Sequence, residues 1–182
     1  MFKNHIQNPL LRGLAEWLLA ILLAVLLFFV VRSFLFRVAH VTGNSMESTL
    51  SHGDMVILNR LSYLFFNPRI GDIIAFPNPE NNGEFFIKRI IAGPGDIVDL
   101  LDGFFVINGI PLEDNFSANP TSLLGNVSFP IEIEEGRYFV LGDNRNNSLD
   151  SRSADVGNIQ ARDMVGRVAI RVFPFDRFGR VE

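Results

Sequence analysis

The sequence predicts a mainly β domain preceded by one long apolar helix. Leu14 to Val31 form an apolar run, LAEWLLAILLAVLLFFVV, which RSFLF extends. Its length is that of a transmembrane helix. Beyond Val38, short runs rich in β-branched and aromatic residues alternate with Gly, Pro, Asn and Asp, a pattern typical of strands joined by turns. The 182 residues suffice for one membrane segment and one sizeable domain, but not for two domains of ordinary size.

A cleavable signal peptide and a buried core helix are the two alternatives for the apolar run. The run is longer than the roughly 7–15 residues of a signal-peptide core, and no small-x-small cleavage site follows it. A core helix has a polar face, whereas only Glu16 interrupts the apolar surface here. We therefore expect an uncleaved transmembrane anchor over residues 14–36, between a short N-terminus of residues 1–13 and a β domain of residues 37–182.

Charge gives little information about orientation but excludes some functions. Lys3 and Arg12 precede the anchor and Arg32 and Arg37 follow it, so the positive-inside count is a tie. After Arg37 there are twelve basic and nineteen acidic residues, a formal charge of −7, which argues against nucleic-acid binding. The absence of cysteine excludes a thiolate nucleophile, a disulfide and a Cys-ligated metal.

Seven runs in the domain are predicted strands. Asp102-Gly103 and Asn108-Gly109 have the composition of tight hairpin turns, which predicts a small meander over residues 96–112. Residues 113–129 accumulate Asn, Ser, Pro and Gly without a period, so we expect a flexible insertion there. The predicted strands are 55–59, 72–76, 84–92, 96–101, 104–108, 137–142 and 164–173.

A catalytic serine in this domain needs a base, which is either a histidine or a lysine. A Ser-His-Asp triad requires a histidine after the anchor, which leaves His40 and His52. His52 lies in SHGD, a composition more often found in a surface turn, and His40 simply precedes a strand-like segment. Neither histidine is favoured as a catalytic base.

The other candidate base is a neutral lysine, whose pKa must be lowered from about 10.4 by burial. Lys88 lies in EFFIKRII, where strand alternation places it between Phe86 and Ile90 on one face. Such a lysine is either an edge residue whose amine reaches solvent or a buried, partly deprotonated group. The strand pattern alone favours the first interpretation.

Four blocks in order make the chain similar to the bacterial type I signal peptidases, serine proteases that cleave leader peptides at the cytoplasmic membrane. GNSMESTL (residues 43–50) resembles the Ser-Met-x-Pro-Thr-Leu block of that family, and GDIIAF (71–76) resembles its second block. FIKRIIAGPGD (86–96) resembles the lysine block, and GDNRNNSLDSR (142–152) resembles the C-terminal block. Together with the anchor, the resemblance runs from about Leu14 to near the C-terminus.

The resemblance implies a Ser-Lys dyad with Ser45 as nucleophile and Lys88 as general base. It also implies a fold, a coiled mixed β-sheet or barrel-like domain shared with other Ser-Lys proteases. Ser148 matches the family serine whose hydroxyl helps to orient the lysine. Three further residues match positions that hold the last block in shape by charge-assisted hydrogen bonds: Asp143, Asp150 and Arg152. No metal or cofactor is expected.

Three positions depart from the family pattern or vary within it. Ser48 stands where proline is usual, and we expect the missing ring to cost less than about 1 kcal/mol if the backbone is otherwise unchanged. Gly43 resembles the Gram-positive pattern, in which the oxyanion hole relies on backbone N–H groups, with that of Ser45 as the leading candidate. Asn146 stands where an acid is frequent, and we interpret it as neutral surface variation.

The resemblance also implies the substrate, the signal peptides of exported preproteins, and a location in the cytoplasmic membrane with the N-terminus inside. Signal peptides present their cleavage site just outside the bilayer, and a nucleophile about a dozen residues beyond the span would lie at that level. The aromatic-rich residues 61–66 are either a segment at the membrane interface or part of an ordinary core. We expect shallow apolar pockets for the substrate residue before the cut and for the residue two positions earlier, which predicts the sequence Ala-x-Ala before the cut. The expected pocket residues are Ala39, Val41, Met46, Leu50, Phe86 and Ile87.

Two other functions are alternatives to that of a signal peptidase. A self-cleaving repressor of the same fold conflicts with the membrane span and with the absence of an N-terminal DNA-binding domain. A non-proteolytic, signal-peptidase-like assembly partner for surface structures is expected to have lost its dyad, whereas Ser45 and Lys88 are both present.

Overall fold

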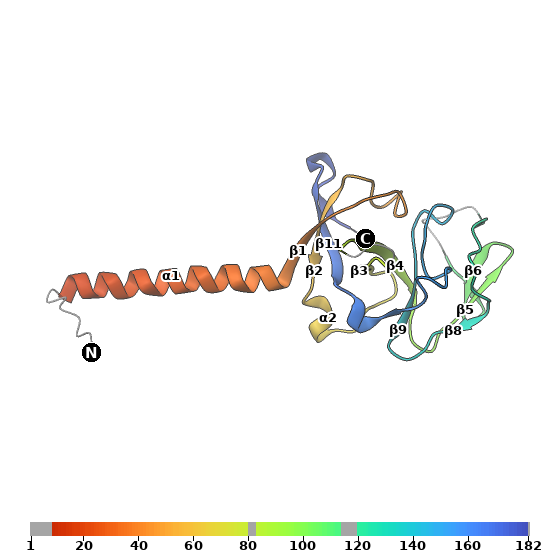
Figure 1. Ribbon diagram of the computed structural model, residues 1–182, viewed down its shortest axis with the longest axis horizontal. Coiled ribbons are helices and arrows are strands. Elements are labelled where there is room, and N and C mark those ends of the chain that lie inside the picture. Colours follow the sequence, from red (N-terminus) through yellow and green to blue (C-terminus); the bar gives the residue numbers. More distant parts are fainter. Residues whose placement is uncertain (1–8, 80–82, 114–119, 182) are drawn as a thin grey trace. The chain divides into compact units, whose positions relative to one another are not determined.

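The computed structural model describes residues 9–79, 83–113 and 120–181 (Figure 1). The chain divides into two compact units, Met1–Leu35 and Phe36–Glu182. The prediction of a mainly β domain behind an N-terminal apolar helix is confirmed.

Among its described residues, the first unit contains one helix, α1 (Pro9–Leu35), of 27 residues. Its stretch Arg12–Val31 is long and apolar enough to cross a membrane, since 20 helical residues rise about 30 Å. The acidic side chain within it does not stand alone, because Arg12 Nε lies 3.1 Å from Glu16 Oε1 one helical turn away. No side chain described between Leu14 and Val31 is buried.

The second unit contains twelve strands and three short helices among its described residues. The helices are α2 (Ser62–Phe65) and the 3₁₀ turns η1 (Ala161–Asp163) and η2 (Phe175–Arg177). The strands are β1 (Phe36–His40), β2 (Met55–Asn59), β3 (Ile73–Pro77), β4 (Phe85–Ala92), β5 (Ile97–Leu101), β6 (Phe104–Ile107), β7 (Ile110–Pro111), β8 (Ile131–Glu132), β9 (Arg137–Leu141), β10 (Ile159–Gln160), β11 (Gly166–Phe173) and β12 (Gly179–Arg180).

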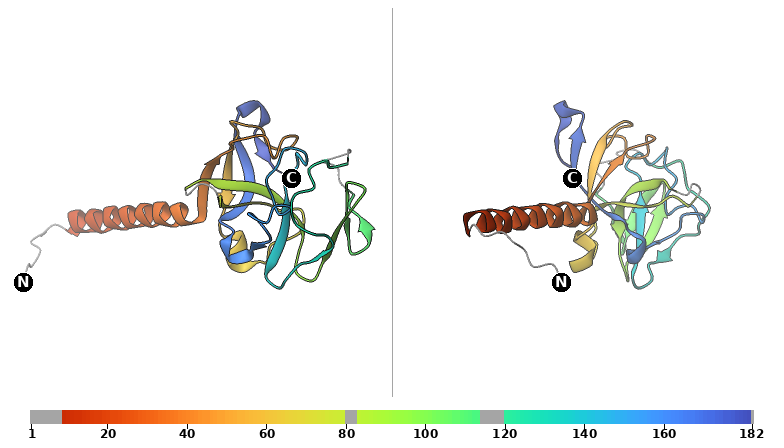
Figure 2. Two further views of the ribbon diagram at one scale, coloured as in Figure 1. Left: turned by 45° about the vertical axis from the view of Figure 1, so that its right-hand side comes forward. Right: turned by 60° about the vertical axis from the view of Figure 1, so that its left-hand side comes forward.

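The strands form two sheets. The larger one has the order β1-β2-β11-β3-β4-β9-β10, with β12 paired to β11, and the smaller one has the order β7-β6-β5-β8. Each of the ten strand pairings is antiparallel, so the sheets are not mixed as the resemblance implied. Figures 1 and 2 show the smaller sheet on the β9 side of the larger one.

Three apolar clusters form the core. One contains Val56, Leu58 and Val168 and lies where β2 and β11 pair. The second includes Ile74 of β3 and Ile90 of β4, and the third joins β9 to the smaller sheet. Because β4 is buried along most of its length, both faces of the strand that carries Lys88 are shielded from water.

Both predicted hairpin turns are present. Asp102 and Asn108 adopt positive φ angles of 52°, and each is followed by a glycine with positive φ, as the tight turns β5–β6 and β6–β7 require. Residues 114–119 of the predicted insertion lie outside the described residues. The described residues 120–129 contain no strand or helix, and hydrogen bonds of this segment with residues 146–154 are considered below.

Candidate active site

Ser45 lies on the loop that joins β1 to β2, here called the nucleophile loop (residues 41–54). The N–H of Val41 donates to the carbonyl of Asp54 at 2.8 Å, and the N–H of Gly53 donates to the carbonyl of Val41 at 2.9 Å. These two hydrogen bonds close the base of the loop, so the strand pairing of β1 and β2 fixes where the loop begins and ends.

The nucleophile loop is held from two sides. Met46 and Leu50 are buried in the cluster at β2 and β11. From the opposite end of the sequence, the N–H of Asn144 donates to the carbonyl of Ser45, and Asn144 Nδ2 donates to the carbonyl of Asn44, both at 3.0 Å. The position of Ser45 therefore depends on the last sequence block as much as on its own.

Lys88 lies on β4 with its amine at the serine. Lys88 Nζ is 2.6 Å from Ser45 Oγ, and only 3% of the lysine surface is exposed. The ring centroid of Phe86 is 4.9 Å from the same nitrogen, and Ile74, the cross-strand partner of Lys88, is fully buried. The amine thus lies among apolar groups and does not reach solvent.

Burial lowers the pKa of Lys88 from its ordinary value of 10.5 to about 8. Desolvation is the largest cause, because an ammonium loses its hydration among apolar side chains. Asp150 and Asp143 act against this effect and Arg152 acts with it. Each acid is already paired with an arginine, Asp150 with Arg152 and Asp143 with Arg89, so desolvation prevails.

Asp143 forms a buried ion pair with Arg89, the residue next to the lysine. Arg89 Nε and Nη2 lie 2.9 and 2.8 Å from the two oxygens of Asp143, a bidentate arrangement. The hydroxyl of Thr49 donates to Asp143 Oδ2 at 2.6 Å. The pair therefore connects β4 to the nucleophile loop and to the last block.

Asp150 and Arg152 form a second bidentate pair. Arg152 Nε and Nη2 lie 2.8 Å from the two oxygens of Asp150, which also accepts the N–H of Gly142 at 3.0 Å. Arg152 Nη1 donates to Thr121 Oγ1 at 2.8 Å and to the carbonyl of Leu123 at 2.6 Å. Neither pair contributes an atom to the Ser45–Lys88 contact.

Ser148 is buried, and its hydroxyl has no hydrogen-bond partner among the described residues. A Cβ built on Gly142 would collide with Ser148 Oγ and with the backbone carbonyl oxygen of Ser45. Only glycine allows the backbone of the last block to approach the nucleophile this closely. Ser148 Oγ makes no hydrogen bond to Lys88 in this structure, so its role in orienting the lysine stays a prediction.

The backbone at Gly43 and Ser45 defines the candidate oxyanion hole. Gly43 has a φ of +85° and no heavy atom within 4 Å of a built Cβ, so glycine is needed for conformation, not for space. Its N–H donates to His52 Nδ1 at 3.2 Å. The N–H of Ser45 makes no hydrogen bond with any described residue, which leaves it available to a substrate oxyanion. His52 thus supports the nucleophile loop, and Ser45 Oγ bonds to Lys88 instead.

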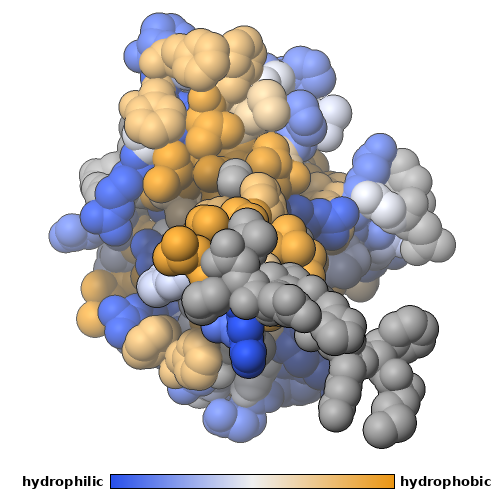
Figure 3. All heavy atoms as spheres, turned by 90° about the vertical axis from the view of Figure 1, so that its left-hand side faces the viewer, coloured by the Kyte–Doolittle hydropathy of each residue, from blue (hydrophilic) through white to orange (hydrophobic). Residues whose placement is uncertain are grey.

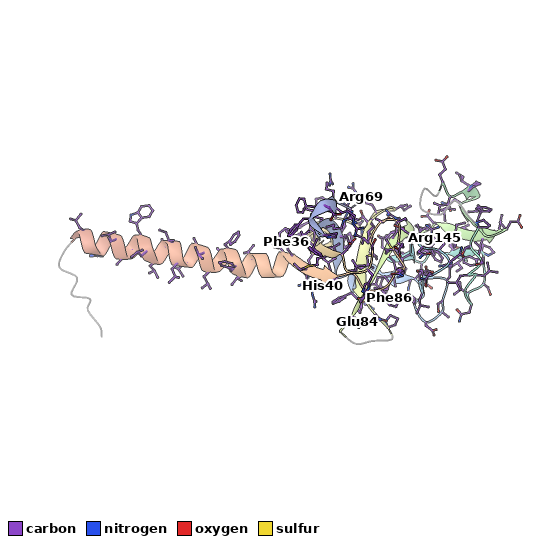
Figure 4. All side chains as sticks on the ribbon, turned by 90° about the horizontal axis from the view of Figure 1, so that it is seen from above. Phe36, His40, Arg69, Glu84, Phe86 and Arg145 are labelled. Carbon is purple, nitrogen blue, oxygen red and sulfur yellow. The ribbon has the colours of Figure 1, made fainter. Side chains whose placement is uncertain are left out.

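A groove of about 250 Å³ runs past Ser45 and Lys88. Four of the six predicted pocket residues line it, namely Val41, Met46, Phe86 and Ile87. Figure 4 labels Phe86 and another lining residue, His40. The other two predictions, Ala39 and Leu50, do not line the groove. Leu50 is fully buried in the core, and Ala39 packs against the same core cluster.

The expectation for Ser48 needs correction. Ser48 has a φ of +89°, whereas the proline ring fixes φ near −65°. The estimate of a small cost assumed an unchanged backbone, and that condition does not hold. The turn after the nucleophile follows a path that proline cannot adopt.

Asn146 is exposed, as the interpretation of surface variation implies, but its side chain makes contacts that this interpretation did not include. Asn146 Oδ1 accepts hydrogen bonds from the N–H and hydroxyl of Ser122, at 2.7 and 3.1 Å, and lies 3.3 Å from Thr121 Oγ1. It therefore attaches the described part of the 113–129 segment to the last block, next to Arg152. An aspartate offers the same acceptor oxygen, which explains physically how an acid suits this position.

Sequence reasoning missed the partners that position the predicted residues. Arg89, Thr49 and Asn144 were not predicted as site residues, although each forms a hydrogen bond with a residue that was. A signal existed for Arg89, since strand alternation places it between Ile87 and Ile91, and a charge on such an apolar face is rarely buried unless it is paired. Nothing local marks Thr49 or Asn144, because their acceptors lie about one hundred residues away in sequence.

A serine hydroxyl in contact with a buried lysine amine, on a β domain, is the arrangement of a Ser-Lys serine protease. Residues 14–173 match the family described as Signal peptidase, peptidase S26. The chain belongs to this family.

Two signal peptidases that are similar in sequence agree with the family match, and one solved structure is also similar. Signal peptidase I of Leptolyngbya laminosa is 36% identical over 183 residues, which cover 96% of this chain and 85% of that protein. Signal peptidase I P of Bacillus subtilis subsp. natto is 33% identical over 172 residues, covering 91% and 92%. The crystal structure of a signal peptidase I from Enterococcus faecalis V583 superposes with a TM-score of 0.47 at 34% identity, covering 56% of this chain and 97% of that chain.

Family membership identifies the chain as a serine endopeptidase of the signal peptidase type. The non-proteolytic assembly partner is not favoured, because the family match extends through all four blocks and the two dyad side chains are in contact.

Proposed function

We propose that Ser45 and Lys88 are the catalytic dyad with which this signal peptidase removes signal peptides from exported preproteins. The observation that carries this proposal is the 2.6 Å contact between Ser45 Oγ and the buried amine of Lys88. The names of the similar proteins and the family match support the substrate class.

The reaction begins when the neutral amine of Lys88 accepts the hydroxyl proton of Ser45. Ser45 Oγ attacks the carbonyl carbon of the residue before the cut, and the negative charge that forms on its oxygen is stabilised by the N–H of Ser45. The ammonium of Lys88 then gives its proton to the leaving amine, and an ester acyl-enzyme remains.

Water completes the cycle by attacking the ester carbonyl. Lys88 accepts a proton from this water and gives it to Ser45 Oγ as the ester bond breaks. The signal peptide then leaves with a free carboxylate, and the serine hydroxyl and the neutral amine are restored. The same base serves both halves because burial keeps its amine neutral over an accessible pH range. This chemistry uses only side chains and backbone of the chain.

The groove supports recognition of an extended peptide with small side chains at the cut. Val41 and Ile87 are buried, branched residues of its wall, and Phe86 adds an aromatic ring. Such close-packed walls accept Ala readily, while a bulkier side chain must displace them at a cost of about 1–3 kcal/mol. A preprotein with Ala-x-Ala before the cut is therefore the appropriate test substrate.

Cleavage should increase with pH on the alkaline side of neutrality. Lys88 acts only when neutral, and its pKa of about 8 means that the active fraction grows as pH rises through that value. The measurement is single-turnover cleavage of an Ala-x-Ala preprotein by the detergent-solubilised chain at a series of pH values.

The matched control for this profile is His52→Ala, which should leave its midpoint unchanged. A rate governed by a group that titrates near 6.5, and lost with His52, would contradict the proposed base.

We also propose that residues 14–36 anchor the protein in the cytoplasmic membrane, with residues 1–13 inside and residues 37–182 outside. The apolar stretch of α1 supports the anchor, and the extracytoplasmic cleavage site of signal peptides supports the orientation. Protease added to intact spheroplasts should digest the β domain and spare an N-terminal tag. A protected β domain would show that the orientation is reversed.

A further inference from the structure

A second cavity lies beside α2 and shares no lining residue with the catalytic groove. Its volume is about 280 Å³, and its lining includes Tyr63, Phe66, Arg69, Asp72 and Arg167. Two guanidinium groups thus face one carboxylate, so the cavity carries a net positive charge although the domain as a whole is acidic.

The carboxylate in this cavity is already fully engaged. Asp72 Oδ1 pairs with Arg167 Nε at 3.0 Å, and Asp72 Oδ2 accepts the hydroxyl of Tyr63 and the backbone N–H of Arg69, both at 3.1 Å. By contrast, the Arg69 guanidinium makes no hydrogen bond or ion pair with any described residue. Arg69 is therefore available to bind an anion. Arg167 also lines the cavity, and it pairs with Asp72 through Nε.

Exposed apolar side chains adjoin the cavity. Phe65, Phe66 and Ile70 are 75%, 66% and 59% exposed. On the face of the molecule seen in Figure 3, hydrophobic side chains appear near the bottom, at the level of α2, and at the top, at the level of η2. Aromatic residues next to arginines are typical of protein surfaces at the membrane interface, where the rings lie at headgroup depth.

The strand register places this cavity close to Phe36, the first residue of the second unit. Phe36 follows α1 directly and pairs with Asn59, which in turn pairs with Arg167. Two strand spacings separate Phe36 from Arg167, about 10 Å, and α2 begins three residues after Asn59. Figure 4 labels Phe36 and Arg69 in the same unit. Phe36 is the first residue after the helix in the chain, so a cavity this near to Phe36 is within reach of lipid headgroups when α1 spans the bilayer.

We propose that this cavity binds the phosphodiester headgroup of an anionic phospholipid. Arg69 and Arg167 contact the phosphate oxygens, and the rings of Phe65 and Phe66 lie among the upper acyl chains. A bound headgroup holds α2 on the bilayer and so fixes the tilt of the β domain relative to an incoming substrate. This inference rests on the proposed membrane anchor, but it does not involve the dyad.

The test is hydrogen exchange of residues 61–72 in the full chain, reconstituted in nanodiscs. One set contains phosphatidylcholine alone, a second contains added phosphatidylglycerol, and a third contains phosphatidylcholine with dissolved glycerol phosphate. Phosphatidylglycerol should slow exchange in this segment, and Arg69→Gln should weaken the lipid dependence about fivefold, the effect of one basic side chain at an anionic surface. Arg60→Gln removes the same charge nearby without altering the cavity lining and should keep the dependence.

Three results would overturn the proposal: equal exchange in the two lipids, equal effects of Arg69→Gln and Arg60→Gln, or full protection by dissolved glycerol phosphate. Cleavage of a soluble peptide is measured in the same samples. Ser45→Ala should lose cleavage and keep the lipid-dependent protection. Protection without cleavage in the wild type would sink the proposed function alone, whereas cleavage without protection would sink the headgroup site alone.

Discussion

Replacing Ser45 by Ala or Lys88 by Met should each reduce preprotein cleavage by at least about 10⁴-fold while the β domain stays folded. The two side chains act as a unit, because Lys88 is the one base and Ser45 the one nucleophile that are in contact with each other among the described residues. The double variant should therefore be no worse than either single one. Single-turnover cleavage and far-ultraviolet circular dichroism measure the two properties.

Lys88→Met should also change how the free energy of unfolding depends on pH, and this change distinguishes it from a variant that is only misfolded. Between pH 8 and 10.5 the unfolded chain holds the Lys88 proton and the folded chain does not, so wild-type stability increases with pH across this window. Met has no proton to lose, so the variant should be more stable at pH 7 by about 3 kcal/mol and should lack this increase. Near-normal cleavage by Lys88→Met would show that the base is another group.

Replacing Asp143 by Ala should destabilise the β domain by about 3–5 kcal/mol, because it leaves Arg89 as a buried charge without its carboxylate. Denaturant unfolding measures this loss. Cleavage should also fall, through kcat more than through KM, because Thr49 loses its acceptor and the nucleophile loop loses an attachment. Asp143→Asn keeps an acceptor oxygen and should recover part of the stability.

Glu134→Gln provides a control for this ion pair. Glu134 pairs with Arg137 at 2.8 Å, but its side chain is largely exposed. Exposed pairs contribute about 0–1 kcal/mol, so this substitution should barely change unfolding or cleavage. Equal losses from Asp143→Ala and Glu134→Gln would contradict the claim that burial makes the Arg89–Asp143 pair important.

The sequence by itself determined the class of fold and the apolar helix, and it supplied Ser45 and Lys88 as the proposed dyad. Strand period, turn residues at Asp102 and Asn108, and the length of the apolar run are local properties, which explains why they can be read from the chain. The prediction that Ser45 acts together with Lys88 depended on the resemblance to the type I signal peptidases. The strand pattern around Lys88, taken alone, favoured an amine that reaches solvent.

Only the tertiary structure decided what surrounds the dyad. The burial of Lys88 depends on β3 and on the ring of Phe86, and the position of Ser45 depends on Asn144, about one hundred residues away in sequence. The contacts of Asn146, the exclusion of Leu50 from the groove and the positive φ of Ser48 were likewise not predicted. Each depends on how distant segments pack and on the backbone path that packing imposes, and no local pattern encodes either.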